Sequence, residues 1–288
     1  MIDRQGRHLP LDAHLHTDLS PDSVVPIDRY AEQAVERGIA EIAITDHVDF
    51  APGTPAYRYT TFEERERVVR EAADRWADRG VTIRFGSEIT WDAAWADDIR
   101  DHLDRHRYDF TIGSVHVYRA SPFDPSNVAG WVAGRSLPDI MAPYFGAVLE
   151  AVRSELFDAL GHIDVAKRYL VPYVTTADLA QAPELYEPIL AALIDTGTAL
   201  EINTSGLRQE SGEMYPSAAI VARYRELGGR AITIGSDAHA AGTFAWALAD
   251  GYEVAAGAGI SSLTLGRGPD AIAVPLATCP NVAAGRSL

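Results

Sequence analysis

Short apolar runs alternate with longer amphipathic stretches along most of the chain. The short runs are typical of buried strands, and they lie at 11–15, 41–45, 81–86, 110–115, 159–163, 198–202, 230–235 and 261–265. Stretches with helical periodicity lie between them, for example at 26–38 and 61–80, and each of these two ends in glycine. This alternation predicts a parallel sheet, and about eight strands in a chain of this length predict a TIM-like (β/α) barrel.

The 288 residues show no repeat, low-complexity block or linker, so we expect one domain over residues 1–288. Residues 119–150 begin as a loop with Pro, Gly and Asn and then become helical. This segment fits either an active-site lid or a plain long connection. The tail at 281–288 is expected to be frayed.

Acidic residues outnumber basic ones by 41 to 25, which gives a formal net charge of −16. That field repels polyanions, so we expect neither a nucleic-acid polymer nor an anionic membrane as partner, whereas a small phosphorylated metabolite remains compatible. The single cysteine, Cys279, excludes an internal disulfide or a thiolate metal cage. No stretch reaches the roughly 20 apolar residues of a membrane span. We expect a soluble, cytoplasmic protein, and the sequence does not predict its oligomeric state.

Histidines and carboxylates gather where the predicted strands end. His14 and His16 stand two residues apart in a strand pattern, so their side chains face the same way. The other residues of this kind at or just beyond strand ends are Asp46, His47, Glu88, His116, His162, Asp237 and His239. In parallel α/β proteins, ligands and catalytic groups lie at the C-terminal strand edge.

A lone histidine at a strand end is usually a structural residue, but here six of the nine histidines fall at such positions. Carboxylates brought together with them would repel one another once they are partly desolvated. Bound divalent cations remove that penalty, so the pattern indicates metal ligation. His8, His102 and His106 lie outside the pattern, and we interpret the last two as part of a solvated helix face.

The ordered set of strand-end motifs resembles the polymerase-and-histidinol-phosphatase (PHP) superfamily. The motifs are H-x-H-T at 14–17, T-D-H at 45–47, G-S-E at 86–88, G-S-V-H at 113–116, G-H-I-D at 161–164 and S-D-A-H at 236–239. Further segments at 20–23, 113–124 and 200–208 resemble the histidinol-phosphate phosphatase branch. The resemblance runs from residue 11 to about 240 and implies a distorted (β/α)7 barrel, one strand fewer than the hydrophobic pattern counts.

The resemblance also implies how two to three divalent ions would share the ligands. The first ion would take His14, His16, Glu88 and Asp237. The second would take bridging Glu88 with His116 and His162, and the third would take Asp22, His47 and His239. Some family members have histidine at the position of Asp22. Imidazole and carboxylate ligands without sulfur suit Zn²⁺, Mn²⁺ or Fe²⁺.

These residue types support hydrolysis of a phosphate monoester. Water between two such ions becomes a hydroxide nucleophile near neutral pH, and the ions neutralise charge that develops in the transition state. We expect in-line attack by this hydroxide, with Glu88 holding the ions and Asp237 or His239 protonating the leaving alkoxide. The resemblance implies L-histidinol phosphate as the substrate, and thus a step of histidine biosynthesis.

Several residues beside the motifs are candidates for supporting roles. Arg168 and Arg208 resemble the family's phosphate-binding arginines, because a guanidinium matches phosphate oxygens bidentately. Asn203 and Ser205 either fix their loop or touch the substrate. Trp91 either lines the pocket or belongs to the core. Asp46 is expected to orient a neighbouring histidine rather than to bind metal.

Three other readings remain open at this point. The enzyme could be a PHP phosphoesterase for a nucleotide or another small phosphate. It could be an amidohydrolase-type C–N hydrolase, although the single lysine, Lys167, is poorly placed to serve as the carboxylated bridge of such sites. Finally, the metals could merely stabilise the fold.

Overall fold

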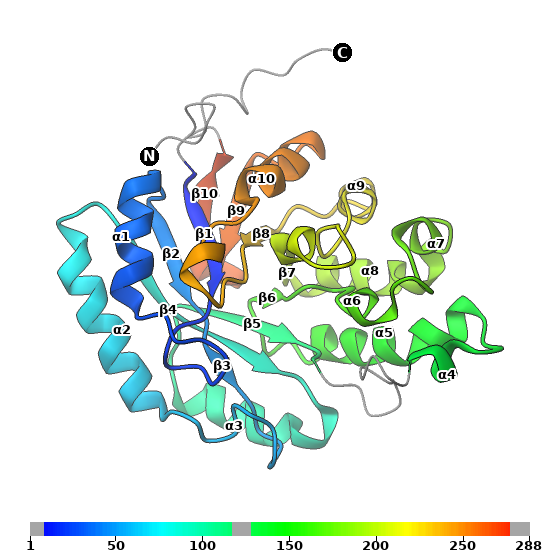
Figure 1. Ribbon diagram of the computed structural model, residues 1–288, viewed down its shortest axis with the longest axis horizontal. Helices are drawn as coiled ribbons and strands as arrows, with labels where there is room; N and C mark the ends of the chain where they lie inside the picture. Colours follow the sequence, from blue (N-terminus) through cyan, green and yellow to red (C-terminus); the bar gives the residue numbers. More distant parts are fainter. Residues whose placement is uncertain (1–8, 117–127, 277–288) are drawn as a thin grey trace.

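Seven parallel strands nearly close into a barrel in the computed structural model, which describes residues 9–116 and 128–276 (Figure 1). In spatial order the strands are β1 (Leu11–Leu15), β2 (Glu41–Ile44), β4 (Thr82–Thr90), β5 (Phe110–Ser114), β6 (Ala159–Leu160), β7 (Ala199–Asn203) and β8 (Ile232–Gly235). The short strand β3 (His47–Val48) pairs with β4 beside this path, which places His47 in register with Glu88.

The helices form an outer ring around the strands (Figure 1). They are α1 (Ile27–Arg37), α2 (Phe62–Ala77), α3 (Ala96–Arg105), α4 (Val128–Val132), α5 (Leu137–Arg153), α6 (Lys167–Leu170), α7 (Thr176–Ala180), α8 (Glu187–Thr196), α9 (Ala218–Glu226) and α10 (Leu248–Gly257). Five 3₁₀ segments are described as well: η1 (Ala93–Trp95), η2 (Pro183–Leu185), η3 (Thr204–Arg208), η4 (Ala241–Thr243) and η5 (Gly268–Asp270). None of the helices in the described residues is long and apolar enough to cross a membrane.

Local sequence sets the ends of the two helices that the pattern predicted. Helix α1 ends at Gly38, which has a φ of 70° and occupies the left-handed conformation that glycine adopts without steric cost. Helix α2 begins after Thr61, whose side chain accepts a hydrogen bond from the backbone N–H of Glu64. Both predicted helices at 26–38 and 61–80 are therefore confirmed to within a few residues.

The barrel closes between its last and first strands through the segment that follows β8. The backbone N–H of Asp237 donates to the His14 carbonyl at 2.9 Å, and the N–H of His16 donates to the Ala238 carbonyl at 3.0 Å. Buried Asp12 on β1 accepts from both the backbone N–H and the hydroxyl of Ser236, at 2.8 and 2.6 Å. This closure brings residues from the two ends of the chain to one rim.

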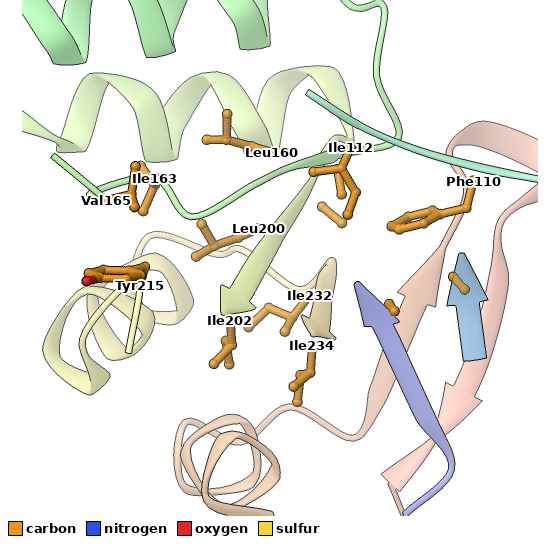
Figure 2. Packing of buried hydrophobic residues seen from close by; sticks show 14 of the residues in the cluster. Phe110, Ile112, Leu160, Ile163, Val165, Leu200, Ile202, Tyr215, Ile232 and Ile234 are labelled. Carbon is orange, nitrogen blue, oxygen red and sulfur yellow. The ribbon is translucent and has the colours of Figure 1, made fainter. Parts of the chain in front are cut away.

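The core lies between the strands and the helix ring. Strand β7 alternates aliphatic and polar residues, so Leu200 and Ile202 lie on the opposite face from Glu201 and Asn203. Ile202 and Ile234 point from neighbouring strands toward α10 (Figure 2), where Gly251 allows the helix to approach them closely. The aliphatic face therefore packs outward and leaves the polar side chains for the barrel interior.

The eighth predicted strand is not part of the barrel. Residues 261–265 form β9 (Ser262–Leu265), which pairs antiparallel with β10 (Ile272–Pro275) in a separate two-stranded sheet. The (β/α)7 fold implied by the family resemblance is therefore correct, and the count of eight barrel strands is wrong. The hydrophobic pattern cannot separate the two cases, because any buried strand carries it.

The long segment at 119–150 is described only in part. Residues 119–127 lie outside the described ranges, as does the predicted frayed tail at 281–288. Residues 137–150 belong to α5, whose buried side chains include Ile140, Tyr144 and Val148. This part of the segment is a core-packed helix of the outer ring.

Candidate metal centre and adjoining cavity

The nine predicted ligands meet in three groups at the C-terminal rim of the barrel. The first group joins β1, β4 and the turn after β8. In this group, the Nε2 atoms of His14 and His16 lie 3.1 Å apart. Glu88 Oε2 lies 3.3 and 3.4 Å from these two nitrogens, and Asp237 Oδ1 lies 3.9 and 3.4 Å from them.

The second group uses the other oxygen of the same carboxylate. Glu88 Oε1 lies 3.0 Å from His116 Nε2 and 2.9 Å from His162 Nε2, and these two nitrogens are 3.3 Å apart. Strand β4 continues to Thr90, so Glu88 lies inside its strand rather than at the end that the sequence predicted. It is 1% exposed and stands between the first two groups.

The third group lies nearer the solvent. Asp22 Oδ2 is 3.1 Å from His47 Nε2 and 3.1 Å from His239 Nε2. His47 also connects this group to the others, because its Nδ1 lies 3.0 Å from Glu88 Oε2. Carboxylate and imidazole atoms of His16, Asp22, His47 and His239 all lie within 4.8 Å of one another.

The spacing and chemistry of these atoms fit divalent ions. Ligands held about 2.0–2.1 Å from a Zn²⁺-sized ion are separated from each other by about 3.0–3.4 Å, depending on coordination number. Most of the distances within the three groups fall in or near this range. The contacts bring together nitrogen and oxygen atoms that carry lone pairs, and such a buried arrangement is stabilised by cations.

The electrostatics of the cluster reflect this crowding. Desolvation opposes ionisation of Glu88, but the surrounding imidazoles of His116, His14 and His47 outweigh it and hold the pKa of Glu88 well below its ordinary value. Desolvation and the charges of His239 and His47 lower the pKa of His16 far below its ordinary value. Glu88 is thus ionised. Desolvation opposes protonation of the other imidazoles, but the surrounding carboxylates outweigh it and raise the pKa values of His14, His47, His162 and His239. Binding of a cation by these imidazoles would therefore release protons.

Glu201 on β7 is a central residue that the sequence reasoning missed. Its Oε1 accepts from His14 Nδ1 at 2.5 Å, and its Oε2 accepts from the backbone N–H of His162 at 2.7 Å. A carboxylate behind a histidine fixes the tautomer and the direction of the other ring nitrogen, here Nε2. The available signal was a glutamate in the middle of a fully buried strand, two residues before Asn203.

The side chain of Asn203 binds the carboxylates of Glu201 and Asp237 instead of lining the cavity. Its Nδ2 donates to Glu201 Oε2 and to Asp237 Oδ2, both at 3.2 Å, and its Oδ1 accepts from the backbone N–H of Ser205 at 3.0 Å. Asp237 has a φ of 52°, a left-handed conformation that is uncommon outside glycine. The contacts of Asn203 therefore help hold a strained residue in place.

Some of the remaining predicted residues support the backbone near the ligands, and others line the adjoining cavity. Arg208 donates to the carbonyl oxygens of Ser236 and Asp237, at 2.8 and 2.6 Å, and so supports the strained turn. Arg168 and Ser205 line the adjoining cavity. Within the described residues, the Asp46 carboxylate has no hydrogen bond to a histidine ring. It accepts from the backbone N–H and the hydroxyl of Thr17, at 2.6 and 2.8 Å, and so fixes the chain directly after His16.

A cavity of about 400 Å³ opens beside the three groups. Seven of the predicted ligands line it: Asp22, His47, Glu88, His116, His162, Asp237 and His239. Trp91 both lines this cavity and is buried, so the two sequence-based interpretations of Trp91 hold together. The volume accommodates a small organic molecule against the ligand groups.

Residues that the sequence placed outside the site do lie elsewhere. His106 stacks on Phe62, and His102 contacts His106 in a tilted arrangement and Phe62 edge-on. His102 Nε2 lies 2.9 Å from the Tyr108 hydroxyl. They are partly buried by this aromatic cluster rather than fully solvated, which corrects the predicted solvated face. Lys167 is buried, with its Nζ 2.8 Å from Asp164 Oδ2 and 3.0 Å from the Met214 carbonyl.

Comparison with known proteins gives consistent matches. The family model described as PHP domain matches residues 12–205. The probable histidinol-phosphatase of Thermotoga maritima is 31% identical over 229 residues, which cover 80% of this chain and 84% of the relative. The probable histidinol-phosphatase of Deinococcus radiodurans is 29% identical over 242 residues, which cover 83% of this chain and 90% of the relative. These matches extend over most of both chains.

Solved structures match the fold. The histidinol phosphate phosphatase of Lactococcus lactis, crystallised with zinc, L-histidinol and phosphate, superimposes with a TM-score of 0.75 at 24% identity, over 90% of this chain and 97% of that one. A protein of Listeria monocytogenes described as a putative histidinol phosphatase gives a TM-score of 0.74 at 20% identity, over 83% of this chain and 99% of that one. At these identities, the likeness concerns the architecture.

Proposed function

The chain belongs to the PHP domain family, and from this membership together with the site geometry we propose that it is a metal-dependent phosphatase that hydrolyses L-histidinol phosphate. The products are L-histidinol and phosphate. This function takes its substrate from the relatives in Thermotoga maritima, Deinococcus radiodurans and Lactococcus lactis, which carry the names histidinol-phosphatase or probable histidinol-phosphatase.

The observation that carries the proposal is the position of Glu88 between two ligand groups on the wall of a cavity. Its two oxygens face different pairs of histidines, His14 with His16 on one side and His116 with His162 on the other. A carboxylate in this position can bridge two ions. Two ions held side by side form the usual arrangement for hydrolysis of phosphate esters.

We assign the ligands as the three groups described above, with Zn²⁺, Mn²⁺ or Fe²⁺ as the ions. Such ions would acidify a water molecule and neutralise the charge of the phosphoryl oxygens. The third group, built on Asp22, His47 and His239, supports a third ion. This group contains one carboxylate and two imidazoles, and such mixed ligands also suit Zn²⁺, Mn²⁺ or Fe²⁺.

The chain's own residues supply substrate binding and proton transfer in this scheme. Arg168 lies on the cavity wall, where its guanidinium can bind two phosphoryl oxygens. Asp237 also borders the cavity. Desolvation opposes its ionisation, but His14, His16 and His239 outweigh that effect and hold the pKa of Asp237 well below its ordinary value. Asp237 and His239 both border the cavity, and we assign protonation of the leaving alkoxide to one of these two residues.

One alternative function is hydrolysis of a different phosphate ester by the same metal-dependent reaction. A PHP phosphoesterase for a nucleotide or another small phosphate would use the same ligands, and only the cavity walls would differ. The amidohydrolase alternative is disfavoured by Lys167, which forms a buried ion pair with Asp164. A lysine held in this way does not supply the carboxylated bridge of such enzymes.

The test is phosphate release by purified protein from L-histidinol phosphate and from a panel of nucleotides, sugar phosphates and phosphodiesters. We expect histidinol phosphate to give the highest kcat/KM, with loss of turnover after chelation and recovery on addition of Zn²⁺ or Mn²⁺. A higher kcat/KM for another ester would favour the alternative substrate. Turnover that survives complete metal removal would contradict the mechanism.

Substituting the bridging carboxylate tests the centre itself. Glu88→Gln should lose bound metal and reduce kcat by about 10³-fold or more, because an amide cannot bridge two cations as an anion does. Metal content measured by elemental analysis accompanies the kinetics. Glu226→Gln, which changes an exposed glutamate on α9, is the matched control and should behave as the parent protein. Full activity of Glu88→Gln would refute the assignment.

A further inference from the structure

The cavity extends beyond the ligand groups and has three further walls. The loop after β3 forms one wall with Asp49, Phe50 and residues 51 and 54–56. The end of β4 and η1 form a second wall with residues 90–92 and 95. The segment around α6 contributes Val165, Arg168 and Tyr169. In Figure 1, α6 and the loop after β3 lie apart, on different sides of the β4–β5 pair.

Charge is distributed unequally over these walls. The α6 wall carries a cation, Arg168, and Arg208 lies close behind it. Burial lowers the pKa of Arg208, and the charge of Arg168 acts in the same direction. The other two walls carry carboxylates that are not among the proposed metal ligands, Asp49 and Asp92. An elongated molecule in the cavity would thus meet guanidinium at one end and carboxylate at the other.

The two carboxylates differ in how far they are already engaged. Asp92 caps η1, because its Oδ1 accepts from the backbone N–H of Ala94 at 2.9 Å. Asp49 receives one long hydrogen bond, from the N–H of Ala56 to Oδ2 at 3.4 Å, and its Oδ1 is buried with no partner among the described residues. Asp49 as a residue is half-buried, and a carboxylate with so few donors gains from a cation that approaches its accessible side.

One cation close to Asp49 already interacts with another residue of this region. It is buried Arg65, whose Nη1 donates to the Asp46 carbonyl at 3.2 Å. Burial lowers the pKa of Arg65, while the charges of Asp46 and Asp49 oppose this effect. One guanidinium therefore lies close to two carboxylates and does not neutralise both of them.

Aromatic side chains line the same cavity as Asp49. Phe50 follows it in the loop, and Trp91 and Trp95 come from the η1 side. Trp91 is 6% exposed, and its indole N–H has no acceptor in the described part of the chain. Aromatic faces attract organic cations through the ring quadrupole and also pack against flat rings.

We propose that the wall formed by Asp49, Phe50, Trp91 and Trp95 is a subsite for a positively charged organic group, and that Asp49 makes the enzyme select phosphate monoesters whose alcohol carries a protonated amine. This inference rests on the proposed function and deepens it, because an aminoalcohol phosphate has an anion at one end and a cation at the other. Histidinol phosphate, with an ammonium group and an imidazole ring, belongs to this class.

The test compares charged and uncharged substrates within one enzyme preparation. The first pair is L-histidinol phosphate and 3-phenylpropyl phosphate, and the second is 2-aminoethyl phosphate and 2-hydroxyethyl phosphate. The readout is the ratio of kcat/KM for the charged member to that for the uncharged member. Metal loading and folded fraction cancel in this ratio.

Asp49→Asn should lower both ratios by about 10-fold or more, because it removes the charge and keeps the shape. Asp49→Glu, which keeps the charge, should retain more of the selectivity than Asp49→Asn. The matched control is Asp195→Asn, on the exposed face of α8, which should leave the ratios unchanged. Equal ratios in Asp49→Asn and the parent protein would overturn the proposal.

Failure of the proposed function would be recognised separately. If histidinol phosphate is not hydrolysed but other monoesters are, its assignment as substrate fails, and the second substrate pair still decides on Asp49. If no monoester is hydrolysed, titration calorimetry with L-histidinol tests whether the subsite exists. A Kd about 10-fold weaker in Asp49→Asn than in the parent protein supports the subsite, and equal affinity, or no binding by the parent protein, overturns it.

Discussion

Individual residues behind the ligands do as much to define this centre as the ligands themselves. Glu201 accepts three hydrogen bonds, from His14 Nδ1, from the backbone N–H of His162 and from Asn203 Nδ2. One buried carboxylate thereby fixes a ligand from the first group, a ligand from the second group, and the asparagine that holds Asp237. We regard Glu201 as a positioning residue for the whole centre.

Glu201→Gln should weaken metal binding about 10- to 100-fold while the protein stays folded. A glutamine has only one acceptor oxygen, so its NH₂ group would face one of the three donors. Metal affinity is measured by competition with a chromogenic chelator, and kcat is measured at saturating Zn²⁺. We expect much of kcat to return at high metal concentration. A loss of kcat with unchanged metal affinity would contradict the positioning role.

His102 gives a residue-level prediction of pH dependence. Desolvation, followed by the charges of His106, Arg105 and Arg65, lowers the pKa of His102 from 6.5 to about 4. The folded state therefore binds fewer protons than the unfolded state between these values, so stability falls as the pH is lowered through this window. His102→Gln removes this contribution.

The measurement for His102 is the free energy of unfolding in urea from pH 7 to pH 4. The difference between the parent protein and His102→Gln should shrink as the pH falls through the window, because only the parent protein must protonate the ring on unfolding. Contributions from all other groups cancel in this difference. Parallel stability curves for the two proteins would show that the ring titrates normally in the folded state.

At the scale of elements, the position of each ligand was predictable because parallel strands end at a common edge. The pattern located β1 correctly and located the ends of most other strands within one or two residues. It missed that β4 continues past Glu88 to Thr90, since the residues after Gly86 include polar Ser87 and Glu88. It also missed Glu201, because a strand pattern records burial and not which neighbour a carboxylate meets.

The three-group arrangement followed from family resemblance rather than from periodicity. Nothing in the spacing of His14, His116 and His162 says that His116 and His162 face one oxygen of Glu88 while His14 faces the other. That division depends on the order of the strands and on the short strand β3 that brings His47 beside Glu88. Geometry of this kind arises only when the barrel closes.

The β1–β8 junction is an element contact that is sensitive to side-chain volume. A Cβ on Gly235 would lie 2.2 Å from the Cβ of His14 and 3.0 Å from Glu201 Oε1. Gly235→Ala should therefore lower the free energy of unfolding by about 1–3 kcal/mol and weaken metal binding, because the strain falls on a ligand and on its hydrogen-bond partner.

The matched control for this change is Gly257→Ala at the end of α10, where a Cβ would meet no atom within 4 Å. Urea unfolding and metal titration of both variants check the prediction. We expect Gly257→Ala to match the parent protein in both measurements. If Gly235→Ala has unchanged metal affinity, β8 does not constrain His14 in the way described.

For the whole molecule, the ligand groups act as cross-links between distant parts of the chain. Asp22 and His239 are separated by 217 positions and share one contact, while Glu88 and His162 are separated by 74. Ions bound at these places stabilise only the folded state. Much of the resistance of this protein to heat should therefore depend on metal.

Complete chelation should lower the melting temperature by about 5–10 °C, and Zn²⁺ or Mn²⁺ should restore it. Differential scanning calorimetry checks the shift, with metal content measured on the same samples. Glu88→Gln should show little further decrease on chelation, because its centre is already impaired. An unchanged melting temperature after verified metal loss would mean that packing alone sets the stability.

The junction between the first and last barrel strands has a consequence for how the protein is made. Leu11 exchanges hydrogen bonds with the Tyr252 hydroxyl across 241 positions, and Asp12 binds Ser236 across 224. His14 and His16 thus leave the ribosome long before Asp237 and His239 exist. A nascent chain paused after β7 exposes an unpaired strand edge, and its first and third ligand groups still lack Asp237 and His239. These two groups are completed only when translation is nearly finished.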